Sequence, residues 1–390
     1  MVPSPGARRT SPAVTHLWKG STLPPHDLSR VRLKTPADLI AAIPALLGIE
    51  PTRSLIVVIE SGQQGMRQIA TALRVDIPTA DLYLPLALQL RRAVQTNGIP
   101  NGSVALIVVD ESPGFDLPHR ELLRLLGEQM RAINVPITAA LWTGSIRTAA
   151  PWASYLGPEA GTLPDPALNV VSLGRIATGH RIFRSRDELA AGLSPATDAT
   201  TVRRRTDMAQ RCQRTFSQGA HSQRTEPDAE TVEAARAVVN DAIIAAVDGQ
   251  LPAHDDDIVQ LAVALTSYGV RDWCINHVFA DSASAAENLW LVLTRESPPG
   301  WRADPAVLLA VHAFARGDGV LANTALDIAD DEQPEHTLGG LLRLTIDSGM
   351  PTTRFLQALR DILPATQRDT RPAVPATQQP AGQIYPPRSG

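Results

Sequence analysis

The sequence has few of the residues and motifs that mark a familiar enzyme. Its two cysteines, Cys212 and Cys274, are too far apart to give a metal-binding spacing. It has no phosphate-binding glycine loop, dinucleotide fingerprint, nucleophile elbow or paired-histidine zinc helix. Its nine histidines are scattered. These absences disfavour the common enzyme classes and predict no metal site, while the cofactor stays unknown and enzymatic activity stays an open question.

Long hydrophobic runs are also missing. No stretch approaches the roughly 18 uninterrupted apolar residues that a membrane span needs. Arg8 and Arg9 near the N-terminus are not followed by an apolar core, unlike a secretory signal. The net charge of −4 gives no general attraction to nucleic acid or to anionic membranes. We therefore expect a soluble, cytoplasmic protein without a membrane partner.

The best-defined stretch runs from residue 34 to residue 78. Thr35 as N-cap and Pro36 at the first helical position predict a helix, which Gly48 can end in a left-handed conformation. Pro44 predicts a kink or a restart within that helix. The continuous apolar run 54–59 predicts a strand buried on both faces.

A second strand follows, with alternating apolar and polar residues. One face is predicted to carry the odd-numbered residues from Ile69 to Ile77, and the other the even-numbered ones from Gln68 to Asp76. Arg74 and Asp76 are thus same-face neighbours about 7 Å apart. They form either a solvated ion pair near a strand end or a pair that faces a ligand.

The clearest α/β signal lies in the next part of the chain. After an amphipathic helix over 81–95, a strand (103–109), a helix (117–133) and a strand (135–142) predict a right-handed crossover with parallel strands. Residues 145–167 are expected to be irregular, followed by a further strand over 167–173 and a helix over 186–193 that Ser185 caps.

Acidic residues follow the first strand of this crossover. Asp110 and Glu111 lie just past its carboxyl end, where open α/β sheets usually place ligands. With Asp116 and His119 nearby, an acid/base or metal cluster is one interpretation. The other is that these are ordinary strand-end acids, with Asp116 as a helix N-cap.

An arginine-rich segment over 202–224 contains a single acid, Asp207. It can be read as a basic arm that contacts phosphates or as a solvated linker helix. The overall acidic balance favours the linker, because nothing else in the sequence indicates nucleic-acid binding.

From residue 225 onward the pattern is helical throughout. Asp255, Asp256 and Asp257 are read as first-turn acids matched to the helix dipole rather than as a cation site. Residues 305–334 have the offsets of one tetratricopeptide repeat, and a further helix pair continues to residue 362. A helical-repeat stack offers a concave surface of the kind that binds protein or peptide.

The opening block resembles the actinobacterial domain of unknown function family 4192. The resemblance rests on Pro36 to Leu39, Pro44 to Gly48, Ser54 to Val58 and Arg74 to Asp76, and on RGDGVLANTALDIA from Arg316. It covers roughly residues 34–363. It implies a fold and a lineage, but no reaction. Many relatives carry clustered cysteines before the serine-arginine-acidic helix, where this chain has WASYLGPEAGTLPDP, so a metal or redox role of those cysteines would be absent here.

The sequence thus predicts an N-terminal α/β region with a mixed sheet and a C-terminal, all-α, partly tetratricopeptide-like region. The expected segments are a disordered tail (1–30), the α/β domain (31–195), an Arg-rich linker (196–224), the helical domain (225–363) and a disordered Pro/Gln-rich tail (364–390).

The leading hypothesis is an interaction or regulatory protein that binds another macromolecule through its helical domain. One alternative is a small-molecule-binding or enzymatic α/β domain that uses Arg74, Asp76, Asp110 and Glu111. The other is weak nucleic-acid binding through the Arg-rich linker.

Overall fold

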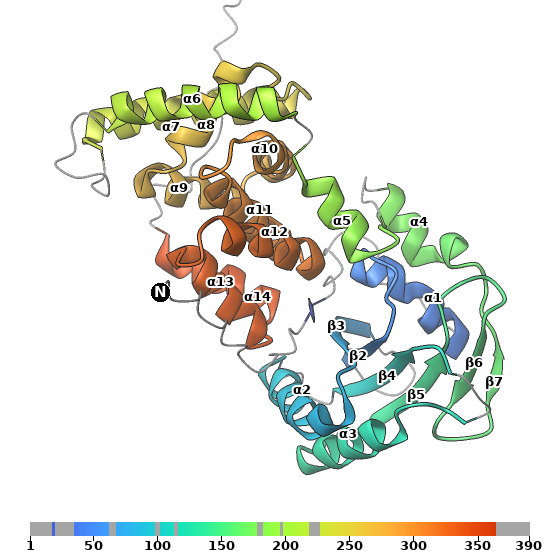
Figure 1. Ribbon diagram of the computed structural model, residues 1–390. Helices are drawn as coiled ribbons and strands as arrows, with labels where there is room; N and C mark the ends of the chain where they lie inside the picture. Colours follow the sequence, from blue (N-terminus) through green and yellow to red (C-terminus); the bar gives the residue numbers. More distant parts are fainter. Residues whose placement is uncertain are drawn as a thin grey trace, which may run out of the picture.

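A computed structural model describes residues 18–19, 35–61, 68–97, 102–112, 116–177, 182–195, 198–217 and 227–363. An N-terminal mixed sheet with helices is followed by an all-helical region, as expected from the sequence (Figure 1). The C-terminal tail lies outside the described residues, and so does the N-terminal tail except for two residues. Those two, Trp18 and Lys19, form a short strand (β1).

The described residues form one seven-stranded sheet in the order β1-β3-β2-β4-β5-β6-β7. β4 and β5 are parallel, as predicted, and the other neighbouring pairs are antiparallel. The further strands are β2 (Ser54–Ser61), β3 (Gln68–Asp76), β4 (Ser103–Val109), β5 (Ile137–Thr143), β6 (Pro151–Ser154) and β7 (Ala160–Thr162).

The two faces of the sheet are covered differently. Alternate residues of β2 point to opposite faces, so Leu55 and Val57 pack with helices α2 (Tyr83–Asn97) and α3 (Arg120–Ala132). Ile56 and Val58 belong to a second core, which continues through α1 (Pro36–Leu47) into the helical region. Both faces are buried, and this explains the continuous apolar run of β2.

Helix α1 follows its sequence signals closely. Thr35 and Asp38 form a reciprocal capping box, and Gly48 ends the helix with φ 81°. The expected restart at Pro44 is wrong, because α1 continues through this residue to Leu47, and a kink there stays a prediction. Pro44 lies in the last turn and is buried in the core, where packing can offset one missing backbone hydrogen bond.

Three local expectations are corrected. Residues 167–173 form no strand; they belong to a 3₁₀ turn and to α4 (Val170–Ala177). Apolar residues of α4 that are exposed to solvent gave this segment the apolar content of a strand. The segment 145–167 is not wholly irregular, since it contains the β6–β7 hairpin. In β3 the alternation reverses at a bulge opposite Ile59 and Glu60, so Ile69 packs on the same side as α1.

The helical region begins after α5 (Arg186–Leu193), which Ser185 caps as predicted. Its paired helices α11 and α12 pack closely, and Gly317 with φ 89° joins them. Tetratricopeptide character stays a prediction. The helices are α6 (Ala199–Phe216), α7 (Ala229–Val247), α8 (Asp255–Ala264), α9 (Tyr268–Cys274), α10 (Ala283–Glu296), α11 (Ala303–Ala315), α12 (Gly319–Glu332), α13 (Thr337–Asp347) and α14 (Thr352–Ile362).

The two regions are held together by specific contacts. Arg186 of α5 forms an ion pair with Asp327 of α12. The Asn97 side chain at the end of α2 donates to the carbonyl of Gly349, 3.1 Å away in the turn between α13 and α14. A Cβ built on Gly349 would lie only 2.9 Å from the Cβ of Ala93, so this turn approaches α2 too closely for a side chain. Among the described helices, none combines the length and apolarity of a membrane span.

Candidate functional site

The four residues singled out from the sequence come from one edge of the sheet. The strand register places Ser54 at the start of β2 beside Asp76 at the end of β3 and Val109 at the end of β4. Asp110 and Glu111 follow directly. This edge is where the carboxyl ends of β3, β4 and β5 meet, as the sequence predicted for β4.

Arg74 is more buried than the expected solvated ion pair allows. Its side chain is 8% exposed, whereas that of its ion-pair partner Asp76 is 59% exposed. The Arg74 Nε also donates to the Ser54 Oγ at 2.9 Å. Burial lowers the pKa of Arg74, and the neighbouring Asp76 opposes this effect. The pair therefore anchors a strand end, with one carboxylate left open to solvent.

Asp110 belongs to a hydrogen-bonded chain with His119 and Tyr83. Its Oδ2 lies 2.8 Å from His119 Nε2, and His119 Nδ1 lies 2.7 Å from the Tyr83 hydroxyl. We call these three residues the relay. It joins the end of β4, the residue before α3 and the first residue of α2. His119 has φ 55°, a strained backbone for a non-glycine residue, and the relay helps to hold it there.

The two hydrogen bonds of the relay fix the orientation of the His119 ring. A carboxylate can only accept, so with a neutral imidazole Nε2 donates to Asp110 and Nδ1 accepts from Tyr83. Neither ring nitrogen is then open to a ligand. Burial, and secondly the charge of Asp110, raise the pKa of Tyr83, so its hydroxyl stays protonated and donating.

The structure does not bring all four predicted residues together. The side chains of Arg74 and Asp76 lie on the face of the sheet that α1 covers, because they pair with Ile56 and Ser54. Asp110 contacts residues of the α2–α3 face instead. Glu111 is exposed. Arg74 and Asp76 therefore share an edge of the sheet with Asp110 but lie on the opposite face from it.

The sequence reasoning missed Tyr83, although it noted His119. Tyr83 begins an amphipathic helix, and an aromatic residue there reads as core packing. The one signal in the sequence was its hydroxyl, because a buried tyrosine usually needs a hydrogen-bond partner. Tyr155 supplies a second example: its hydroxyl donates to the Pro118 carbonyl at 2.6 Å, next to the relay.

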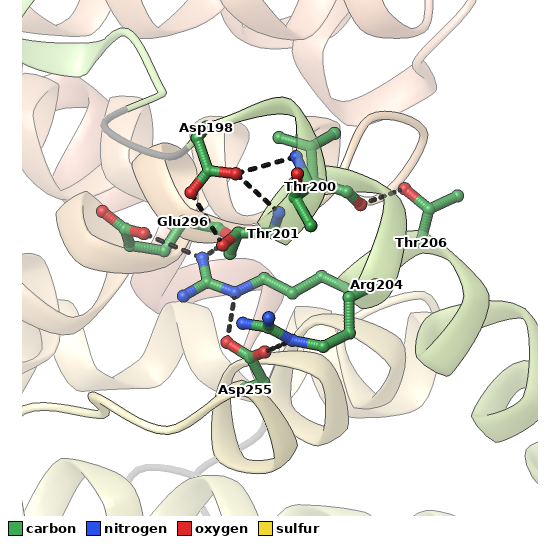
Figure 2. Close-up of polar contacts among 9 residues, drawn as sticks. Asp198, Thr200, Thr201, Arg204, Thr206, Asp255 and Glu296 are labelled. Atoms are coloured by element: carbon green, nitrogen blue, oxygen red, sulfur yellow. Dashed lines mark hydrogen bonds and ion pairs between the residues drawn. The ribbon is translucent and has the colours of Figure 1, made fainter.

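The arginine-rich segment is partly used inside the protein. It contains α6, which packs on α8, and Arg204 and Arg205 both form ion pairs with Asp255 (Figure 2). Arg205 also pairs with Glu296. Burial acts to lower the pKa of Arg205, but the hydrogen bonds to these carboxylates outweigh it and leave the pKa raised. The helix in this segment is therefore not uniformly solvated. Asp255 lies in the first turn of α8, as predicted, and it also holds α6 against α8 through these ion pairs.

A small cavity lies in the helical region, between α7 and the residues before α10. It measures about 110 Å³ and is lined by Asn240, Ile243, Ile244, Val247, Asp248, His277 and Ser282. His277 is buried, its Nδ1 is 3.3 Å from the Ser282 Oγ, and its Nε2 has no partner among the described residues. Burial lowers the pKa of His277 to about 4, so the ring is neutral at pH 7.

No cluster of metal ligands stands out. Over the described ranges, no three histidine, cysteine, aspartate or glutamate side chains come together in a way that could hold a metal ion. Both cysteines are free, and burial raises the pKa of the Cys274 thiol, so it stays protonated at neutral pH.

Comparison with protein families gives one match. The model of the family described as "Domain of unknown function (DUF4192)" matches residues 36–353, which is most of the chain. The chain therefore belongs to this family, as the opening block suggested. Neither the curated proteins nor the solved structures include a match.

Proposed function

We propose that this member of the DUF4192 family is an interaction protein, and that its helical region binds a basic amphipathic segment of another protein. The observation that carries the proposal is the exposed apolar face at the end of α7. Ile244, Val247 and Leu251 are large apolar residues exposed to solvent there. Ile244 and Val247 line the cavity that His277 also lines, and Leu251 follows α7 in the chain. We call these three residues and the cavity the α7 face.

The size of the cavity favours a protein partner over a metabolite. Small-molecule pockets usually measure about 300–1,000 Å³. At about 110 Å³, this cavity is too small for a whole metabolite, but a single side chain can enter it. An anchor residue that fills a pocket, surrounded by weaker contacts, is a common pattern in protein interfaces.

Charge indicates the chemistry of the partner. Asp241 on α7, Asp248 directly after α7 and Asp281 before α10 are exposed around the α7 face. His277 adds no positive charge at neutral pH because burial lowers its pKa to about 4. An apolar surface with an acidic rim fits a helix that carries apolar residues on one face and arginine or lysine beside them.

A peptide-binding measurement tests the proposal. The probe is a fluorescent helical peptide of about 18 residues, made of leucine, alanine and arginine, and its counterpart carries glutamate in place of arginine. We expect the full-length chain to bind the basic peptide at least tenfold more tightly than the acidic one. Val247→Asn should weaken binding about tenfold, since it removes a central apolar contact.

The matched control is Leu344→Asn on α13. Leu344 is 68% exposed and Val247 is 60% exposed, so both substitutions replace an exposed aliphatic side chain in the same region. Equal weakening by both variants, or equal affinity for the two peptides, would refute the proposal. Thermal melting of each variant checks that the fold is retained.

A further inference from the structure

A groove in the α/β region, far from the α7 face, has the features of a ligand site. It runs between α3 and β5, measures about 500 Å³ and has three arginines among its lining residues. Its volume is within the usual range for small-molecule pockets. We propose that this groove binds an elongated amphipathic anion, of the class of long-chain carboxylates.

The groove follows from how the sheet is covered. Helix α3 packs over β4, and after β5 the chain continues into the β6–β7 hairpin without another helix on that face. The floor is therefore apolar: Leu106 and Ala140 come from β4 and β5, and Leu123 comes from α3. Leu156, after β6, is 62% exposed at the edge.

Gly127 opens the middle of the groove. It lies in the interior of α3, where glycine costs about 1 kcal/mol relative to alanine. A Cβ at this position would meet only Arg131 Nη2, at 3.9 Å, so packing does not require glycine there. The absence of a side chain at Gly127 instead leaves space between the helix and β5 that an apolar chain can occupy.

The charges lie along one stripe of α3. Arg120 is in its first turn and Arg131 in its last, about 16 Å apart along the axis at about 1.5 Å per residue. Arg124, between them, is neutralised by Glu121 and Glu128. Neither Arg120 nor Arg131 has an ion pair within the part of the chain that the structure describes. The groove thus offers a positive charge at each end and an apolar floor between them.

The end at Arg120 is held rigidly. Tyr155 lines the groove and fixes the Pro118 carbonyl, while the relay fixes His119. Burial raises the pKa of Tyr155, so its hydroxyl remains a donor at physiological pH. Arg120 follows these two residues directly, so its backbone is positioned before a ligand arrives. Preorganisation of this kind reduces the entropic cost of binding.

Binding of dodecanoate, measured by calorimetry below its micellar concentration, tests the proposal. The full-length chain should bind dodecanoate and should not bind dodecyltrimethylammonium, which has the same chain and the opposite charge. Replacing both Arg120 and Arg131 by glutamine should weaken binding at least tenfold. Gly127→Leu should abolish binding, because its side chain would occupy the groove and its Cβ has no close neighbour.

Gly192→Leu is the matched control. Gly192 is another helical glycine of the α/β region, and a Cβ added to it would have nothing within 4 Å, but it does not line the groove. It should leave dodecanoate binding unchanged. Three outcomes would overturn the proposal: no heat of binding with dodecanoate at about 1 mM, equal binding of the cationic amphiphile, or unchanged binding by Gly127→Leu.

Discussion

His119 in the relay and His277 in the helical region differ in how many of their polar atoms have hydrogen-bond partners. His119 has both ring nitrogens hydrogen-bonded, to Asp110 and to Tyr83. His277 has one weak contact, and neither its Nε2 nor that of the neighbouring His312 has a partner in the described part of the chain. Side chains whose polar atoms all have hydrogen-bond partners are held in one geometry. A buried polar atom without a partner lowers the stability of the fold, but it can still form a hydrogen bond with a ligand.

Burial also determines how the histidines of the helical region respond to protons. Burial lowers the pKa of His277 to about 4 and that of His312 to about 3. Protonation of either ring has to overcome burial without a carboxylate to offset it. The helical site should therefore be sensitive to acid, and the relay should be sensitive to the loss of any one member.

The largest expected effect comes from breaking the relay. His119→Ala leaves the Asp110 carboxylate and the Tyr83 hydroxyl without their partner, and each such group costs about 1–3 kcal/mol. We expect a loss of roughly 3 kcal/mol in the free energy of unfolding, measured by urea denaturation. Replacement of the exposed His254 by alanine is the control. A loss no larger than that of the control would show that the relay does not brace the fold.

The second prediction concerns pH. The folded-state pKa of His277 is about 4, below its ordinary value of 6.5, so the unfolded state binds more protons between these values. The stabilising contribution is fully present above pH 6.5 and decreases as the pH falls toward 4. At about pH 5 the expected loss from this residue is roughly 2 kcal/mol.

His277→Phe should remove that dependence. The imidazole of His277 contacts Trp273 edge-on, with 4.9 Å between the ring centroids. A phenyl ring in its place can keep this contact but cannot be protonated. The urea midpoint of the variant should change less between pH 7 and pH 5 than that of the natural chain. An identical change in both proteins would mean that His277 stays accessible to protons in the folded state.

A third, smaller effect tests how tightly the two regions meet. Gly349→Ala places a Cβ within 2.9 Å of Ala93 at a residue with φ 71°, so it should cost roughly 1–2 kcal/mol. Thermal melting provides the measurement. If stability is unchanged, the turn can move away from α2 and the contact between the regions is loose.

The smallest effect has the opposite sign. Gly340 lies inside α13, and a Cβ there would meet nothing within 4 Å. Gly340→Ala should therefore stabilise the protein by about 0.5–1 kcal/mol through helix propensity alone. Comparison of the two variants distinguishes Gly349, where the packing leaves no space for a side chain, from Gly340, where it does. A loss of stability would indicate that the surface of α13 is in contact with another part of the chain.

Much of the fold could be predicted from the sequence, because the signals were local. The capping residues of α1, the apolar run of β2 and the β4–α3–β5 crossover all depend on neighbours in the chain. The failures occurred where distant contacts decide. The β6–β7 hairpin pairs with the edge strand β5, and α4 packs against α1. Both elements depend on these distant contacts, so their sequences carry little local hydrophobic periodicity.

The candidate site was harder to predict for the same reason. Arg74, Asp76 and Asp110 were placed correctly at a strand edge, but sequence spacing cannot say which face each residue occupies relative to another strand. Tyr83 and His119 are 36 residues apart and meet only through the packing of α2 beside α3. In the sequence alone, the arginines of the groove look like ordinary surface residues, because the groove forms only where α3 packs beside β5.

The shared core has a consequence for how the protein unfolds. One set of buried side chains runs from the α1 face of the sheet through Leu189 and Leu193 of α5 into the helices. Separating the two regions would expose that apolar surface on both sides, so neither is a self-sufficient folding unit. Heat or denaturant should therefore melt them in one cooperative transition, and a ligand bound at either region should protect amide hydrogens in the other from exchange.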